Sequence, residues 1–196
     1  PVVAALFAIM TKVGVYAMLR VVPLVFGERA GAAAWVPAPW LLPAAMLTAV
    51  LGFGGVLAAR GLREQAAFAL IGSTGTLLLA VARWTPAATS AALYYLVHAT
   101  LAGAMLFLVA DVTLRRRGQY GDAVTPSPRF AGQEHAALLY LAAAVGAVGL
   151  PPLSGFVGKL LILRGTMEAP WQGAIWATVL GTTLIGVIVL LPWATP

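Results

Sequence analysis

The residues of this 196-residue chain best suited to chemistry are two lysines that lie inside apolar sequence. Lys12 stands in Met-Thr-Lys-Val-Gly-Val, and Lys159 stands in Phe-Val-Gly-Lys-Leu-Leu. Arginine stays protonated in proteins, whereas a desolvated lysine can lose its proton near neutral pH. We therefore predict that Lys12 and Lys159 load and release protons. The alternative for each is a lysine near a segment end whose ammonium group snorkels to the membrane surface.

Two further titratable residues lie in a long apolar segment from about Ala87 to Leu114. An ordinary imidazole has a pKa of about 6.5, which suits His98 as a proton relay between the lysines. The alternative is a structural hydrogen bond from His98 to a neighbouring helix. Asp111 stands one turn before Arg115, so we expect a structural ion pair between them, with an auxiliary proton role as the alternative.

Arg63 is a candidate auxiliary group at the start of another apolar segment, where Glu64 follows it. The alternative is a positive charge at the membrane edge followed by an acid in the first helical turn. The same segment carries three hydroxyl side chains that we expect to form hydrogen bonds between helices: Ser73, Thr74 and Thr76.

A break in helical sequence follows in Gly-Leu-Pro-Pro-Leu-Ser-Gly, from Gly149 to Gly155. The prolines remove two backbone donors, and the glycines allow tight turns. Unpaired carbonyls at membrane depth are tolerated only beside protein or water, and interrupted helices in transporters face ion pathways. We predict an interrupted helix beside Lys159, with an ordinary surface loop as the alternative. The break residues are Pro151, Pro152, Ser154 and Gly155.

The amino-acid composition indicates that the segments carrying these residues lie in a lipid bilayer. Hydrophobic residues make up 61% of the chain and charged residues 9%, with a mean hydropathy of +0.94. A soluble domain carries about 25% charged residues, so an ordinary soluble enzyme and a nucleic-acid binder are excluded. The absence of cysteine removes disulfides, thiolate metal sites and cysteine catalysis. His98 and His135 show no metal-ligand spacing, and we expect no metal, no cofactor and no catalytic site.

An all-α, polytopic integral membrane protein with six to seven transmembrane helices is therefore expected, because a spanning helix needs about 20 apolar residues. We predict a single transmembrane domain over residues 1–196, with a loop over residues 118–133. The chain begins at Pro1 within an apolar run, so we expect a fragment of a longer protein rather than a processed chain. The expected segments are Val2 to Phe26, Trp40 to Ala59, Glu64 to Ala82, Ala87 to Leu114, Glu134 to Met167 with the break, and Trp171 to Leu191.

Charge predicts the orientation of these segments. The connection with Arg60 and Arg63 falls on the same side as the loop that begins at Arg115–Arg117, and basic loops mark the cytoplasmic side. Tryptophans near the segment ends are expected to anchor the chain in the headgroup region. They are Trp35, Trp40, Trp84, Trp171 and Trp193.

Three stretches resemble the D subunits of the multisubunit Mrp-type monovalent cation/proton antiporters, which are similar to the antiporter-like proton-channel subunits of respiratory complex I. They are Met10-Thr-Lys-Val-Gly-Val-Tyr-Ala-Met-Leu-Arg20, Tyr94-Tyr-Leu-Val-His-Ala-Thr-Leu with Leu106-Phe-Leu-Val-Ala-Asp111, and Gly149-Leu-Pro-Pro-Leu-Ser-Gly-Phe-Val-Gly-Lys-Leu-Leu-Ile-Leu163. The resemblance covers most of the chain in order.

The resemblance implies about fourteen helices in two inverted repeats, with a hydrated line of lysines, a histidine and a glutamate. It matches Lys12 to the central lysine of an interrupted helix in the first repeat, Lys159 to the terminal basic residue of the second, and His98 to the histidine of the central axis. The family's Asp-x-Lys-Arg-like sequence before the third segment is replaced by Gly61-Leu-Arg-Glu64. Because Arg63 cannot release a proton, it is a poor substitute for the lysine of that sequence.

The leading hypothesis is a proton-translocating subunit of a hetero-oligomeric Na⁺ or K⁺/proton antiporter in a bacterial inner membrane, with other subunits and lipid as partners. The alternative is a proton-pumping membrane subunit of complex I or a membrane-bound hydrogenase. A scaffold without transport is the third hypothesis, in which leucine could replace the lysines with a gain in stability.

Overall fold

The computed structural model describes residues 2–123, 132–169 and 171–190, and these residues form helices joined by short connections. The α-helices are α1 (Val2–Phe26), α2 (Ala38–Ala58), α3 (Leu62–Val81), α4 (Pro86–Arg117), α5 (Gln133–Val148), α6 (Ser154–Gly165) and α7 (Gln172–Leu190). Two short 3₁₀ helices, η1 (Glu28–Ala33) and η2 (Gly118–Tyr120), lie in the connections after α1 and α4. The all-α prediction is confirmed.

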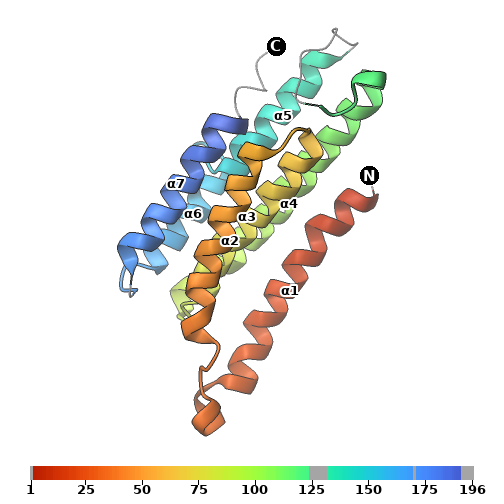
Figure 1. The fold of residues 1–196 in the computed structure, drawn as a ribbon. Coiled ribbons are helices and arrows are strands. Elements are labelled where there is room, and N and C mark those ends of the chain that lie inside the picture. The colour runs from red at the N-terminus through yellow and green to blue at the C-terminus, as the bar shows by residue number, and fades with distance from the viewer. Residues whose placement is uncertain (1, 124–131, 170, 191–196) are drawn as a thin grey trace.

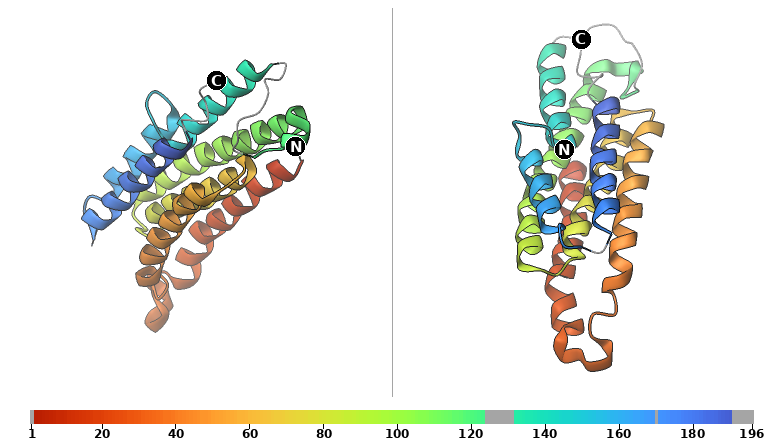
Figure 2. Two further views of the ribbon diagram at one scale, coloured as in Figure 1. Left: turned by 45° about the horizontal axis from the view of Figure 1, so that its top comes forward. Right: turned by 90° about the vertical axis from the view of Figure 1, so that its left-hand side faces the viewer.

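The helices run up and down in one elongated bundle, in which α1 lies along one side (Figure 1). Five helices of the described residues are long and apolar enough to cross a membrane: α1, α2, α3, α4 and α7. The two shorter helices, α5 and α6, lie end to end (Figures 1 and 2). The prediction of a polytopic membrane protein is therefore confirmed.

Exposure supports the same conclusion. In the apolar window of α1 only 11% of the residues are buried, whereas in α3 the share is 67%. The exposed side chains of α1 are large and apolar, and Leu24 is 82% exposed. Such a surface suits hydrocarbon or neighbouring transmembrane helices, since an apolar patch of this size is rare on soluble proteins.

Small residues bring the central pair of helices together. A Cβ atom placed on Gly52 of α2 would collide with the backbone of Gly72 on α3, and one placed on Gly75 would collide with Ala49. Dispersion forces rather than the hydrophobic effect hold helices together in lipid, so close backbone approach is the main source of this attraction. The α2–α3 pair thereby forms a fixed wall against which α4 and α7 pack.

The described connections after α2 and after α4 lie together at one end of the bundle. The amide of Leu62 donates a 2.9 Å hydrogen bond to the carbonyl of Asp122, and Gly61 forms a β-bridge with Ala123. The prediction that these two basic regions share a side is confirmed. Residues 124–131 of the predicted loop lie outside the described residues.

Arg115–Arg117 were expected in that loop, but they form the last turn of α4. Arginine is a good helix former, and its charge interacts favourably with the carbonyl end of a helix. The helix ends one residue later at Gly118, whose φ of 55° is readily adopted only by glycine.

Four predicted anchor tryptophans lie at the opposite end, in or beside the connections that join α1 to α2, α3 to α4, and α6 to α7. The rings of Trp35 and Trp84 contact each other in a tilted arrangement, with a centroid distance of 5.5 Å and an interplanar angle of 44°. Trp40 and Trp171 are 77% and 71% exposed, and Trp193 lies outside the described residues. Interface anchoring of these rings stays a prediction.

Candidate proton-relay site

The side chain of Lys12 points from α1 into the bundle and is only 2% exposed. Its Nζ atom donates to Oγ1 of Thr74 at 2.8 Å and to Oγ of Ser73 at 3.3 Å. Both hydroxyls donate in turn to the carbonyl of Leu70 on their own helix, α3. Ser73 and Thr74 therefore do link two helices as expected, and they do so by holding a buried lysine.

The helix that carries Lys12 differs from one expectation. Within the described residues α1 runs from Val2 to Phe26 without interruption, although it contains Pro23. The expectation that Lys12 lies on an interrupted helix is therefore wrong within these residues, whereas its match to the central lysine of the family stays a prediction. The hydroxyls of α3 provide the acceptors that the carbonyls of a broken helix would otherwise supply.

The break between α5 and α6 lies where the sequence predicts it. Helix α5 ends at Val148, and Gly149 takes a left-handed φ of 77°. In a continuous helix the carbonyl of Val148 would accept from residue 152, but Pro152 has no amide hydrogen. Pro151, Pro152 and Ser154 are exposed, whereas Gly155 is buried. The break leaves a carbonyl in need of another donor.

Lys159 supplies that donor. It lies on α6, is 5% exposed, and its Nζ atom donates to the carbonyl of Val148 at 2.8 Å. A second bond runs from Nζ to Oγ1 of Thr183 on α7 at 2.7 Å, and the ring of Phe53 on α2 lies 5.5 Å away. The expectation that Lys159 stands beside the break is therefore correct in space as well as in sequence.

His98 joins the two sides of the same break from near the middle of α4. Its Nε2 lies 2.9 Å from the carbonyl of Gly146 at the end of α5, and its Nδ1 lies 2.9 Å from Oγ of Ser154 at the start of α6. Because a carbonyl only accepts, Nε2 carries a hydrogen in this arrangement, and the Ser154 hydroxyl can serve Nδ1 as donor or acceptor. A side chain on Gly155 would intrude here, since its Cβ would lie 2.7 Å from Nε2.

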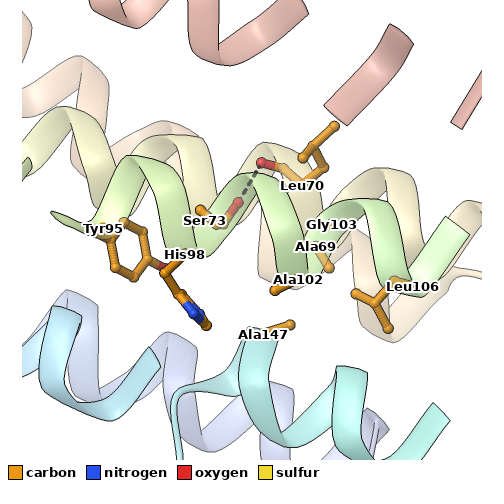
Figure 3. Close-up of a pocket in the computed structure, with 10 residues that line it drawn as sticks. Ala69, Leu70, Ser73, Tyr95, His98, Ala102, Gly103, Leu106 and Ala147 are labelled. Atoms are coloured by element: carbon orange, nitrogen blue, oxygen red, sulfur yellow. Dashed lines mark hydrogen bonds between the residues drawn. The ribbon is translucent and has the colours of Figure 1, made fainter. Parts of the chain in front are cut away.

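A small cavity lies between α3, α4 and α5 (Figure 3). Ser73, a partner of Lys12, and His98, a neighbour of the break, both line it. Small residues of α3, α4 and α5 form much of the remaining wall, among them Ala69, Ala102 and Ala147. The arrangement places a hydroxyl and an imidazole around one shared space between three helices.

Arg63 and Asp111 meet at the end of the bundle rather than beside the lysines. Oδ1 of Asp111 lies 2.9 Å from Nη2 of Arg63, and its Oδ2 lies 2.9 Å from Nε of Arg115. The predicted Asp111–Arg115 pair is confirmed. The additional pair joins α3 to α4, and it gives Arg63 a structural contact that its sequence position alone did not reveal.

Sequence reasoning missed two contributors. Thr183, which accepts a hydrogen bond from Lys159, is one of several threonines in an apolar helix. Only the presence of a hydroxyl group in an apolar segment could have suggested its role. Gln65 of α3 is 2% exposed and accepts a 3.3 Å hydrogen bond from the hydroxyl of Tyr140 on α5. The described residues hold no cluster of three or more histidine, cysteine or acidic side chains able to bind a metal ion.

The fold and the buried lysines define a helical membrane protein with titratable groups inside its transmembrane bundle. The chain belongs to the NADH:quinone oxidoreductase/Mrp antiporter transmembrane family, whose profile matches residues 1–186.

Relatives with assigned names point the same way. Over 188 residues the chain is 34% identical to a protein of Rhizobium meliloti named as the D subunit of a K⁺/H⁺ antiporter, covering 87% of this chain and 35% of the relative. It is 35% identical over 170 residues to the antiporter subunit mnhD2 of Staphylococcus aureus, covering 84% of this chain and 32% of the relative. The chain thus spans about a third of the length of these relatives.

Two solved structures share the fold. Respiratory complex I from Thermus thermophilus aligns with a TM-score of 0.77 and 28% identity over 93% of this chain and 38% of that one. The Mrp complex from Dietzia sp. aligns with a TM-score of 0.77 and 25% identity over 94% of this chain and 34% of that one.

Proposed function

We propose that this chain is part of a proton-translocating subunit of a monovalent cation/proton antiporter, in which Lys12, His98 and Lys159 relay protons. The observation that carries the proposal is the pair of buried lysines. Each donates to hydroxyl or carbonyl oxygens, and among the described residues neither forms an ion pair with a carboxylate. Burial without a counter-charge disfavours the charged form of a lysine, so both Lys12 and Lys159 can alternate between the charged and the neutral form.

The relay follows the contacts of the site. A proton on Lys12 lies next to Ser73, which borders the cavity that His98 also lines. In the proposed relay a water molecule in this cavity links the hydroxyl to the imidazole, since Ser73 and His98 supply polar atoms to a wall that is otherwise mostly apolar. Beyond His98, the imidazole and Lys159 contact carbonyls two residues apart at the end of α5, those of Gly146 and Val148. Because a carbonyl only accepts a hydrogen bond, water completes the proposed path between the two side chains. No cofactor or metal is required for these steps.

Membership of the family supports a proposal for the partners, the ions and the location of the subunit. The proposed partners are other subunits of a hetero-oligomeric complex and the lipid bilayer, and the transported ions are protons and Na⁺ or K⁺. We place the subunit in the inner membrane of a bacterium, with the end that carries Arg60, Arg63 and Arg115–Arg117 in the cytoplasm. Arg63 and Asp111 are auxiliary at most, since their ion pair lies at this end.

The test is proton flux in inverted vesicles that contain the complete complex, with Na⁺ or K⁺ added and no electron donor. We expect cation-dependent flux in the wild type and loss of that flux in Lys12→Ala. Retention of full flux in Lys12→Ala would contradict the relay. Arg164→Ala provides a control, because Arg164 is a basic residue at the end of α6, outside the proposed relay.

A second candidate function rests on the likeness to respiratory complex I, whose structure aligns with nearly the whole chain. In this case the same relay pumps protons at the expense of a redox reaction. Flux that needs NADH or another reductant and ignores added cations would establish the redox-driven pump. The two outcomes exclude each other in the same vesicles.

A further inference from the structure

We propose that Thr183 of α7 is a positioning residue for Lys159, whose hydroxyl holds the ε-amino group beside the break in both its charged and its neutral form. The inference rests on the proposed function, in which Lys159 carries a proton. It adds a residue on a different helix that controls how readily Lys159 gains and loses that proton.

The two hydrogen-bond partners of Lys159 differ in whether they can donate as well as accept. The carbonyl of Val148, 2.8 Å from Nζ, can only accept a hydrogen bond. The hydroxyl of Thr183, 2.7 Å from Nζ, can accept from an ammonium group or donate to the lone pair of a neutral amine. Thr183 is therefore the one of these two partners that can serve both protonation states.

The position of the hydroxyl hydrogen agrees with the charged form. Oγ1 of Thr183 lies 2.7 Å from the carbonyl of Val179, one turn earlier on α7, and donates to it. With its hydrogen directed there, the hydroxyl presents a lone pair to Lys159. When the ammonium group loses a proton, rotation about the Cβ–Oγ1 bond lets Thr183 donate to the amine nitrogen.

Other groups near Lys159 do not offer this exchange. The ring of Phe53 attracts a cation but has no hydrogen to donate to an amine. His98 is the titratable group that interacts electrostatically with Lys159, but both of its ring nitrogens are engaged by Gly146 and Ser154. The ring of Tyr95 packs against Gly158, the residue before Lys159.

Fixed charges are also distant along the elements that pack against α6. Helix α7 contains no charged residue, and neither does α2, which carries Phe53. Asp111 of α4 pairs with arginines at the end of the bundle, and Tyr140 of α5 bonds to Gln65. The other charged or imidazole side chains of α3 and α5 stand in the first turn of each helix: Arg63, Glu64, Glu134 and His135. With no carboxylate near Lys159 among these residues, the hydroxyl of Thr183 has a larger influence on whether Lys159 is protonated.

The surroundings of Lys12 show the same device. There Ser73 and Thr74 accept from Nζ and also donate to the carbonyl of Leu70 on their own helix. In both places a buried lysine reaches a hydroxyl on a neighbouring helix, and that hydroxyl is bonded back to its own backbone. The repetition supports a shared role for these hydroxyls in proton exchange.

The experiment measures proton flux against pH in vesicles with the complete complex. Thr183→Val removes the hydroxyl at nearly constant volume, and Thr183→Ser restores it. Thr182→Val is the matched control, because Thr182 is a buried neighbour on the same helix whose hydroxyl bonds only to carbonyls of α7. Lys159→Ala tests the underlying function, and immunoblotting of the membranes reports assembly.

We expect Thr183→Val to lower flux about tenfold, because a hydrogen bond to a charged group is worth about 1.5–3 kcal/mol and 1.4 kcal/mol corresponds to a factor of ten. The pH of half-maximal flux moves lower, since the charged form loses the stronger bond. Thr183→Ser restores both quantities, and Thr182→Val leaves them unchanged. If Thr183→Val does not assemble, the same results are expected of Thr183→Ala, which adds no atoms.

The inference is overturned if Lys159→Ala abolishes flux while Thr183→Val and Thr183→Ala keep the wild-type rate and pH profile. It is also overturned if Thr182→Val changes both quantities as much as Thr183→Val does. If Lys159→Ala itself retains full flux, the proposed function fails at Lys159, and the inference fails with it. These patterns differ, so the two failures can be told apart.

Discussion

The Nζ atom of Lys159 lies 2.8 Å from the carbonyl oxygen of Val148, a carbonyl that has lost its helical donor to Pro152. The break and the lysine are thus complementary: the proline frees an acceptor, and the ammonium group uses it. His98 contacts a second carbonyl of the same helix end, that of Gly146, two residues earlier. The interrupted helix is therefore held by the groups that we propose to carry protons.

The imidazole of His98 can be tested for proton transfer separately from its structural bonds. His98→Gln keeps a side-chain donor and acceptor near Gly146 and Ser154 but cannot titrate. We expect normal assembly and a fall in proton flux of about 100-fold, the lower part of the range for proton transfer by a positioned side chain. His98→Phe is expected to impair assembly as well. Wild-type flux in His98→Gln would show that the residue is only structural.

The close packing at the break makes Gly155 sensitive to any side chain. A Cβ atom in Gly155→Ala would collide with the carbonyl of Gly146 and lie 2.7 Å from Nε2 of His98. We expect a loss of flux and a lower melting temperature of the purified complex. Gly181→Ala is the control, because nothing lies within 4 Å of the Cβ it adds. Equal behaviour of the two variants would contradict the packing seen at the break.

The two hydroxyls that hold Lys12 are expected to contribute unequally. Thr74 accepts at 2.8 Å and Ser73 at 3.3 Å, and shorter bonds to charged donors are stronger. Thr74→Val should therefore lower cation-dependent proton flux more than Ser73→Ala, and the double variant should lower it most. Thr48→Val serves as the control, since the Thr48 hydroxyl bonds only to Ala44 of its own helix. The result would count against this site if the double variant had wild-type flux.

The buried pair formed by Gln65 and Tyr140 is predicted to stabilise the contact between α3 and α5. Tyr140→Phe removes the donor and leaves Oε1 of Gln65 unsatisfied, which costs about 1–3 kcal/mol. Replacing both groups, in Gln65→Leu with Tyr140→Phe, should recover much of the lost stability. Thermal unfolding of the complex in detergent measures both changes. Additive losses in the double variant would show that the two side chains act independently.

The amino-acid sequence was enough to predict the class of protein and the positions where a membrane helix carries an unfavourable charge or loses a backbone hydrogen bond. Long apolar runs require helices in a membrane, because every backbone polar group must be satisfied within the helix. Two prolines in succession require a break, and lysine in an apolar run requires acceptors. These requirements follow from single residues and their neighbours in the chain. The sequence therefore allowed us to predict Lys12 and Lys159 as candidate proton carriers and to predict the interruption of the helix.

The hydrogen-bond partners of the two lysines became known from the packing of the helices. Lys12 is held by residues 61 and 62 positions away, and Lys159 by Thr183, 24 positions away. Helices that are apolar on nearly every face give no periodic signal of their neighbours, so the sequence does not reveal which helix lies opposite. The acceptors of Lys12 lie on α3, and those of Lys159 lie at the end of α5 and on α7, so the packing of the helices places them.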